Sequence, residues 1–204
     1  MGLKYTLSLL LGFVLGVGMS SCTSQEGKSL ADSQFSQGEY AEAIISYTEE
    51  LKTNPKDINL LFSRGRAYQE LGQLLQAQAD FDLALQQDPK NSQVLMSLSL
   101  VHLDQGSYAS ALLHATKAEE IDGPLAMSSL LKARAFHRLG MPEEALDAYG
   151  MAIQLDKNFA QAYFNRGILK IALKRTKEAC EDFQQAASLE YAGAEQALTS
   201  YCRN

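Results

Sequence analysis

The sequence predicts an all-α fold in which helices pair into hairpins and the hairpins stack into a solenoid. The first observation behind this prediction is composition. The 204-residue chain has 4 prolines, no tryptophan and abundant alanine, leucine, glutamine and glutamate, which favours helix. The second observation is self-similarity at a period of 34 residues, the signature of stacked supersecondary units. Five alanines mark this period: Ala43, Ala77, Ala111, Ala145 and Ala179.

Other columns of the repeat keep the same phase, and each has a packing role. A small residue stands twelve positions before each alanine, where two helices must approach closely. An aromatic ring stands four positions after the alanine in every repeat except the third, which has Ala115. A glycine five positions before the alanine, replaced by Lys174 in the fifth repeat, is expected to end the first helix in a left-handed conformation. The small residues are Ala31, Gly65, Ser99, Ala133 and Gly167.

This pattern resembles the tetratricopeptide repeat. The resemblance covers residues 24–193, with repeats at about 24–57, 58–91, 92–125, 126–159 and 160–193. It implies a right-handed α-solenoid of about five helix-turn-helix hairpins, which we place at 30–193. Residues 194–204 contain the stretch AEQALTSY, which we expect to form a capping helix over the apolar face of the last hairpin, as solenoid ends require.

The first residues have the layout of a secretory signal, which we place at 1–21. Lys4 is followed by the apolar stretch 5–19 and then by two serines, a basic start and an apolar core ending at small residues. An uncut membrane anchor is the alternative, because residues 5–25 carry no charge and are long enough to span a bilayer. The following residues, 22–29, are polar and are expected to form a short tether.

The end of this segment, Met19-Ser20-Ser21-Cys22, resembles the lipobox of bacterial lipoproteins. The resemblance implies cleavage before Cys22 and acylation of that residue, and several acyl chains together make a stable membrane anchor. Thr23 follows the cysteine in place of aspartate, which by resemblance to enterobacterial sorting implies the outer membrane, facing the periplasm. We therefore expect a lipid-anchored protein of the bacterial cell envelope.

Net charge narrows the range of partners. The chain carries a net charge of −6 and has no long run of lysine or arginine, whereas binding to nucleic acid relies on clustered basic charge. Nucleic acid is therefore not an expected partner. An acidic body also adheres poorly to anionic lipid headgroups, so we expect membrane attachment only through the lipid anchor.

In the resembled family, the concave surface is lined by the second, fifth, ninth and twelfth positions of the first helix in each hairpin. The residues at these positions are largely apolar, with a few arginines and one histidine, which suits an amphipathic helix or an extended segment with apolar anchors and some acid. The alternative is that some of these side chains belong to the core. The candidate groove residues are Phe62, Arg66, Gln69, Met96, Leu100, Leu103, Leu130, Arg134, His137, Phe164, Ile168 and Ile171.

Two cysteines remain beside Cys22. Cys180 occupies a mostly apolar position of the repeat, expected to face the end helix that carries Cys202. A disulfide between Cys180 and Cys202 is consistent with a location outside the cytoplasm. Two buried thiols that act as small hydrophobic side chains are equally consistent with the sequence.

No motif for catalysis or for a cofactor stands out. The three histidines lack metal-ligand spacing, and the glycines follow the 34-residue period of the turns instead of forming a phosphate-binding loop. We therefore expect no metal, no cofactor and no enzyme activity. The predicted function is an envelope scaffold or adaptor for a protein or peptide partner, assisting assembly of a pilus, a secretion pore or the peptidoglycan machinery. A small-molecule-binding lipoprotein or an envelope enzyme is the alternative and would need a closed polar cavity.

Overall fold

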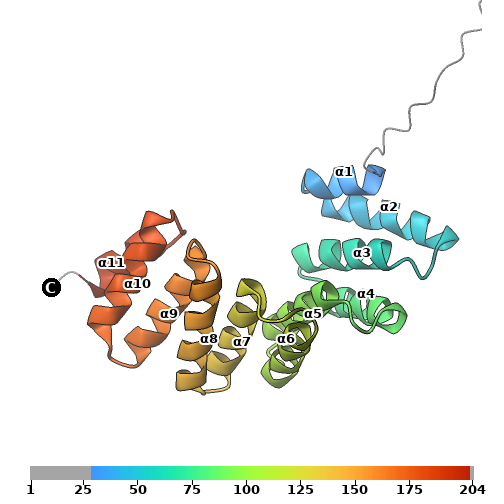
Figure 1. Cartoon of the computed structure of the whole chain (residues 1–204). Helices are drawn as coiled ribbons and strands as arrows, with labels where there is room; N and C mark the ends of the chain where they lie inside the picture. The colour runs from blue at the N-terminus through green and yellow to red at the C-terminus, as the bar shows by residue number, and fades with distance from the viewer. Residues whose placement is uncertain (1–28, 203–204) are drawn as a thin grey trace, which may run out of the picture.

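The computed structural model describes residues 29–202, which form eleven α-helices and no strands (Figure 1). The predicted signal, Cys22 and nearly all of the tether lie outside these described residues. Within residues 29–202, no helix combines the length and apolar character needed to cross a bilayer. The helices are α1 (Leu30–Ser36), α2 (Tyr40–Thr53), α3 (Ile58–Glu70), α4 (Leu74–Gln87), α5 (Ser92–Asp104), α6 (Tyr108–Asp122), α7 (Ala126–Arg138), α8 (Pro142–Leu155), α9 (Ala160–Ala172), α10 (Thr176–Ser188) and α11 (Ala194–Tyr201).

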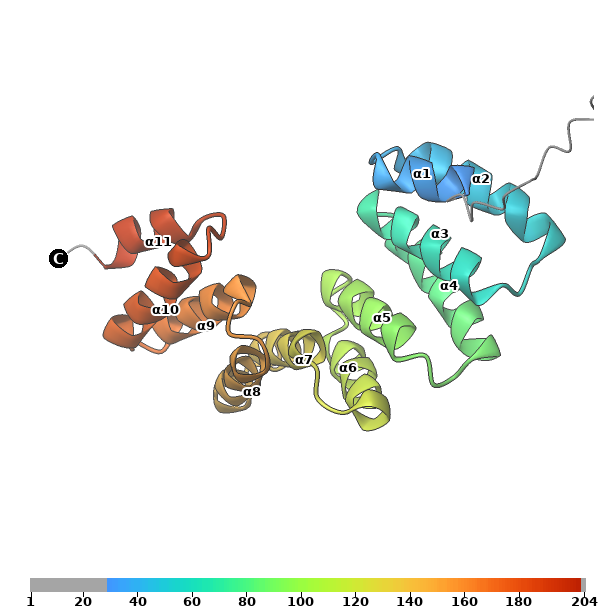
Figure 2. The ribbon, with the colours of Figure 1, turned by 45° about the horizontal axis from the view of Figure 1, so that its top comes forward.

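The helices pair in chain order into five hairpins, and α11 packs against the last of them. The hairpins follow an arch, in which α5 and α7 lie on the inner side and α6 and α8 on the outer side (Figure 2). The all-α hairpin stack predicted from the sequence is thereby confirmed. From the second hairpin onward, the first helices are all 13 residues long and begin one period apart, at Ile58, Ser92, Ala126 and Ala160.

The turn inside each hairpin requires one residue in the left-handed region. Gly140, after α7, has φ +76°, and Lys174 takes φ +61° at the corresponding place in the fifth hairpin. A side chain costs about 1–2 kcal/mol in this conformation. The fifth hairpin bears this cost between two helices that bury Gly167, Leu169, Ala179 and Phe183.

In the second and fifth hairpins, the glycine of the small-residue column is explained by a ring within the same hairpin. Phe81 from α4 lies over Gly65 of α3, and a Cβ atom built on that glycine would be 2.6 Å from the ring. Phe183 of α10 lies over Gly167 of α9 at the same distance. Both rings are fully buried. The ring thus occupies the space over the first helix of its own hairpin, in addition to separating neighbouring hairpins.

The carboxy-terminal end of the stack is closed by α11. Its residue Ala197 joins the buried cluster around Ala179 and Phe183, so the last hairpin shares its apolar face with this helix. Cys180 of α10 and Cys202, which follows α11, form a disulfide in the structure. Of the two arrangements that the sequence left open for these cysteines, the structure has the bonded one.

The third hairpin contains a stacked pair of histidines between its two helices. The rings of His102 in α5 and His114 in α6 have centroids 5.1 Å apart. His114 Nδ1 lies 2.7 Å from the carbonyl oxygen of Ser110. Burial lowers the pKa of His114 below its ordinary value near 6.5, and positive charge on His102 would lower it further. The folded protein therefore favours the neutral form of His114.

We expect Gly167→Ala to destabilise the protein by about 1–3 kcal/mol, because the new methyl group would overpack against Phe183. Gly150→Ala is the matched control. Gly150 also lies within a helix, but the nearest atom to an added Cβ is 3.9 Å away, so alanine there should be neutral or stabilising by up to about 1 kcal/mol. Thermal melting followed by circular dichroism measures both. Equal melting temperatures for the two variants would contradict the packing described here.

We expect the free energy of unfolding to decrease as pH falls from about 7.5 to about 5.5. The unfolded chain, in which the pKa of His114 is ordinary, then binds a proton that the folded chain resists. His114→Ala should flatten this dependence, and alanine at this place has a precedent in the fourth hairpin, Ala148. Urea denaturation at several pH values measures the slope. His137, whose pKa is lowered by burial and by Arg138, contributes equally to both proteins, so an unchanged slope in the variant would refute the role of His114.

Candidate functional site

Two hollows lie along the first helices of the hairpins, and they form the candidate site. The amino-terminal hollow has a volume of about 290 Å³ and lies between the first and second hairpins. The carboxy-terminal hollow has a volume of about 380 Å³ and spans the third, fourth and fifth hairpins. The first is lined by Asp32, Phe35, Ser36, Tyr47, Phe62, Ser63 and Arg66. The second is lined by Leu103, Asp104, Tyr108, Arg134, His137, Arg138, Tyr149 and Asn165.

The carboxy-terminal hollow is dominated by two arginines of α7. Arg134 and Arg138 stand one helical turn apart and so share a face of the helix. Arg134 Nη2 lies 3.7 Å from Asp104 Oδ1, a loose ion pair at the solvent boundary. Arg138 donates a hydrogen bond to the Tyr108 hydroxyl, and its guanidinium carbon lies 5.0 Å from the centre of that ring. This hollow thus contains two guanidinium groups and one carboxylate, which leaves a net positive charge.

Three neighbours complete this hollow. The pKa of His137 is lowered by burial and by Arg138, so its imidazole is neutral at neutral pH. Tyr149 is buried and forms part of the wall. Asn165 contributes a side-chain amide from α9. Guanidinium groups bind carboxylates with paired hydrogen bonds, and an amide can pair with a peptide backbone. The arrangement suits an acidic peptide group.

The amino-terminal hollow is more aromatic. The Tyr47 hydroxyl donates a 2.7 Å hydrogen bond to Asp32 Oδ1. Burial raises the pKa of Tyr47, and the hydrogen bond to Asp32 raises it further, so the hydroxyl stays protonated. Phe35 and Phe62 supply apolar lining, and Arg66 stands at the edge, 3.5 Å from Glu70. This hollow suits an apolar side chain next to a polar group.

Part of the predicted groove is wrong. Leu130 is 1% exposed and packs in the core of the fourth hairpin, so it does not line an open surface. Leu103 is 7% exposed and reaches the carboxy-terminal hollow only with an edge. Phe62 and Phe164 are half-buried against the rings of their own hairpins, with centroids 5.8 Å from Phe81 and 5.7 Å from Phe183 respectively. The fifth repeat position thus packs partly against the core ring in the second and fifth hairpins, and of the predicted groove residues at this position only Phe62 lines a hollow.

The remaining predicted residues divide into two groups. Arg66 lines the amino-terminal hollow together with Phe62, and Arg134 and His137 line the carboxy-terminal one. The other predicted groove residues line neither hollow, and all of them are half-buried apart from Leu130: Gln69, Met96, Leu100, Leu130, Phe164, Ile168 and Ile171.

Sequence reasoning missed several polar residues of the site. Asp104 and Arg138 occupy the thirteenth repeat position, one turn after the ninth, and Asn165 occupies the sixth. The signal that could have found Arg138 is its spacing of four residues from Arg134, which puts both on one helix face. Within residues 29–202, no group of three or more histidine, cysteine, aspartate or glutamate side chains is arranged to hold a metal ion.

Comparison with known sequences finds three matches to tetratricopeptide repeat models, at residues 62–126, 133–174 and 160–192. Human Superkiller complex protein 3 is 33% identical over 129 residues, which cover 63% of this chain and 8% of that protein. The chain therefore spans less than a tenth of the length of this relative.

Comparison with solved structures finds the same fold at low sequence identity. The crystal structure of MamA residues 41 to the end from Desulfovibrio magneticus RS-1 has a TM-score of 0.70 and 22% identity, and the match covers 78% of this chain and 90% of that one. YrrB, described as a TPR protein with an unusual peptide-binding site, has a TM-score of 0.64 and 20% identity, with 83% and 88% of the two chains covered. These likenesses establish the fold.

Proposed function

The chain belongs to the tetratricopeptide repeat family, and from this premise we propose that it is a scaffold that binds a protein or peptide partner along its inner face. Proteins of this family generally mediate protein–protein interactions through the extended concave surface of the stack. The observation that carries the proposal is the carboxy-terminal hollow, where Arg134, Arg138 and Asn165 converge from two helices.

The charges of the two hollows define the partner. The carboxy-terminal hollow takes a carboxylate, because its lining holds two arginines and one carboxylate, Asp104, which pairs only loosely with Arg134. The amino-terminal hollow takes an apolar side chain against Phe35 and Phe62. A segment that spans both therefore carries an apolar anchor toward one end and an acidic residue toward the other, as an amphipathic helix or an extended peptide does.

The open form of the site favours a peptide over a small molecule. Arg138 is exposed and Asp104 is exposed at the boundary of the carboxy-terminal hollow, whereas small-molecule sites enclose most of their ligand. This supports the scaffold over the alternative of a small-molecule-binding lipoprotein or an envelope enzyme.

We expect the double variant Arg134→Gln, Arg138→Gln to fold normally and to capture the partner at least about tenfold less well, because a few buried or charged anchors dominate most interfaces. The measurement is crosslinking and pull-down from native envelope, with quantification of the proteins that the unaltered chain enriches. Lys117→Gln, Lys177→Gln is the matched control, since it removes the same charge from exposed positions outside both hollows. Equal capture by the two double variants would move the partner site away from the carboxy-terminal hollow.

We further propose that the scaffold is anchored through lipid on Cys22 to the outer membrane of a bacterium and faces the periplasm, where it assists assembly of an envelope complex such as a pilus, a secretion pore or the peptidoglycan machinery. The lipobox-like Met19-Ser20-Ser21-Cys22 and the following Thr23 support this location. The bond between Cys180 and Cys202 also supports it, because disulfides persist mainly outside the cytoplasm.

We expect Cys22→Ser to abolish both acylation and signal cleavage. The unaltered protein should incorporate labelled palmitate and sediment with membranes at its processed mass, whereas the variant should lose the label and keep the mass of the uncut chain. Cys202→Ser is the control, because it removes a cysteine without touching the signal. A Cys22→Ser protein that remains in the membrane fraction with unchanged size relative to the unaltered protein would favour the uncut anchor.

A further inference from the structure

One position of the repeat is filled by a paired side chain in four of the five hairpins and is left open in the fourth hairpin. It stands three residues after the period-marking alanine of each second helix, and its occupants are Ser46, Asp80, His114, Ala148 and Asp182. Ser46 donates a 2.7 Å hydrogen bond to Gln34 Oε1. Asp80 receives two hydrogen bonds from Arg64, at 2.8 and 2.7 Å. Asp182 is paired in the same way with Arg166. His114 stacks on His102.

The fourth hairpin has only a methyl group at this position, that of Ala148. The cation of this hairpin, Lys132, pairs with a carboxylate at a different place. Lys132 Nζ lies 2.7 Å from Glu119 Oε2, a carboxylate supplied by α6 of the preceding hairpin. Ser129 donates a 3.1 Å hydrogen bond to the other oxygen of Glu119. Because the Lys132 side chain is drawn toward Glu119, the space that an arginine–aspartate pair fills in the second and fifth hairpins stays vacant.

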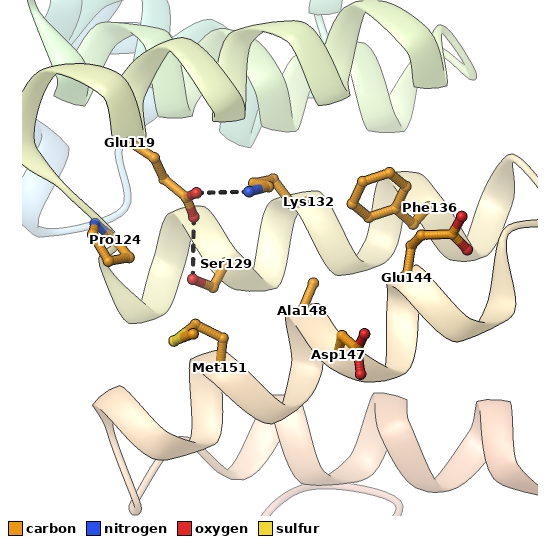
Figure 3. Close-up of a pocket in the computed structure, with 9 residues that line it drawn as sticks. All are labelled: Glu119, Pro124, Ser129, Lys132, Phe136, Glu144, Asp147, Ala148 and Met151. Carbon is orange, nitrogen blue, oxygen red and sulfur yellow. Dashed lines mark hydrogen bonds and ion pairs between the residues drawn. The ribbon is translucent and has the colours of Figure 1, made fainter.

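The result is a pocket of about 350 Å³ between α7 and α8, which we call the α7–α8 pocket (Figure 3). Its apolar lining includes Phe136, Ala148 and Met151, and Met151 is 43% exposed. Glu144 and Asp147 of α8 stand beside this lining, as the sticks in Figure 3 show. Both carboxylates are exposed, and neither forms an ion pair within residues 29–202.

This pocket is distinct from the inner face. Consecutive residues of an α-helix are rotated by about 100°, so Ser129, Lys132 and Phe136 share one side of α7, whereas Arg134 and Arg138 lie on the other side. No residue lines both the α7–α8 pocket and the carboxy-terminal hollow. A ligand of one site therefore leaves the other accessible.

We propose that the α7–α8 pocket is a second docking site, for a basic segment of a protein partner that inserts one large apolar side chain. The apolar side chain packs against Phe136, Ala148 and Met151, and flanking lysines or arginines pair with Glu144 and Asp147. The charge is complementary because the cation of the site, Lys132, is already neutralised by Glu119. A volume near the lower end of ligand pockets leaves room for one side chain and its neighbours, and not for a folded domain.

The test uses the full chain labelled at the methionine methyl groups. The sequence has 6 methionines, and the signal of Met151 is assigned by its loss in Met151→Leu. The probe is a short synthetic peptide with a central phenylalanine flanked by lysines. Titration should shift the Met151 methyl signal in a saturable way. The matched peptide with alanine in place of phenylalanine should bind about tenfold more weakly or worse, since it loses the burial of a ring.

Two variants separate the apolar and the charged contributions. Ala148→Leu fills the pocket without changing charge and should weaken binding by about tenfold or more. Glu144→Gln, Asp147→Asn leaves the pocket open and should weaken binding by about threefold at low salt, with little difference at high salt. Arg134→Gln, Arg138→Gln should leave the titration unchanged, so failure of this site and failure of the inner-face site are distinguishable. Circular dichroism melting checks that each variant is folded.

Three results would each overturn the proposal. The first is a Met151 signal that does not move at millimolar peptide. The second is equal binding of a peptide whose lysines are replaced by glutamate, which would show that the pocket selects apolar ligands regardless of charge. The third is undiminished binding by folded Ala148→Leu, which would place the peptide elsewhere on the molecule.

Discussion

The contact of an aromatic ring with a small residue of the same hairpin, present in every hairpin except the third, is the constraint on which most of the structure depends. Where Phe81 and Phe183 lie over glycines, the approach leaves no room for a methyl group. The fourth hairpin repeats the pairing with Tyr149 and Ala133, both buried. Because this contact fixes how the two helices of a hairpin meet, it also fixes which positions of the first helix are left to face outward. The proposed binding surface therefore consists of the positions that the packed rings leave exposed.

The sequence predicted the fold well, because five repeats of one pattern together resolve assignments that would be ambiguous in a single repeat. Each packing requirement recurs every 34 residues, so the small, aromatic and turn positions confirm one another. The groove was predicted less well, because a repeat position specifies the side of the helix on which a side chain lies but not how deeply that side chain is buried. Leu130 and Phe62 both occupy the fifth repeat position, yet the first is buried and the second is half-buried and lines the amino-terminal hollow. The difference depends on how far neighbouring hairpins cover each helix, which no single helix encodes.

Other features lay beyond the sequence for different physical reasons. The sequence placed Cys180 opposite the end helix that carries Cys202, but it left open whether the two thiols are bonded, because a bond requires a distance that the repeat pattern does not specify. The α7–α8 pocket depends on what Ala148 lacks, together with the direction taken by Lys132. A pocket of this kind can be recognised only from the positions of the surrounding side chains. The periodic pattern indicates which repeat positions are packed, and it does not indicate where a pocket is left between helices.

The disulfide has a consequence for the behaviour of the molecule at high concentration. Every solenoid ends in a face that resembles the interior, and that face can pair with the end of another molecule as readily as with its own cap. A cap held only by apolar contact competes with such neighbours, and crowding shifts the balance toward chains of molecules. The covalent link between α10 and the end of α11 keeps the cap at a fixed local concentration that no neighbour can match. The link thus favours closure of this end of the stack by its own α11 over pairing with another copy.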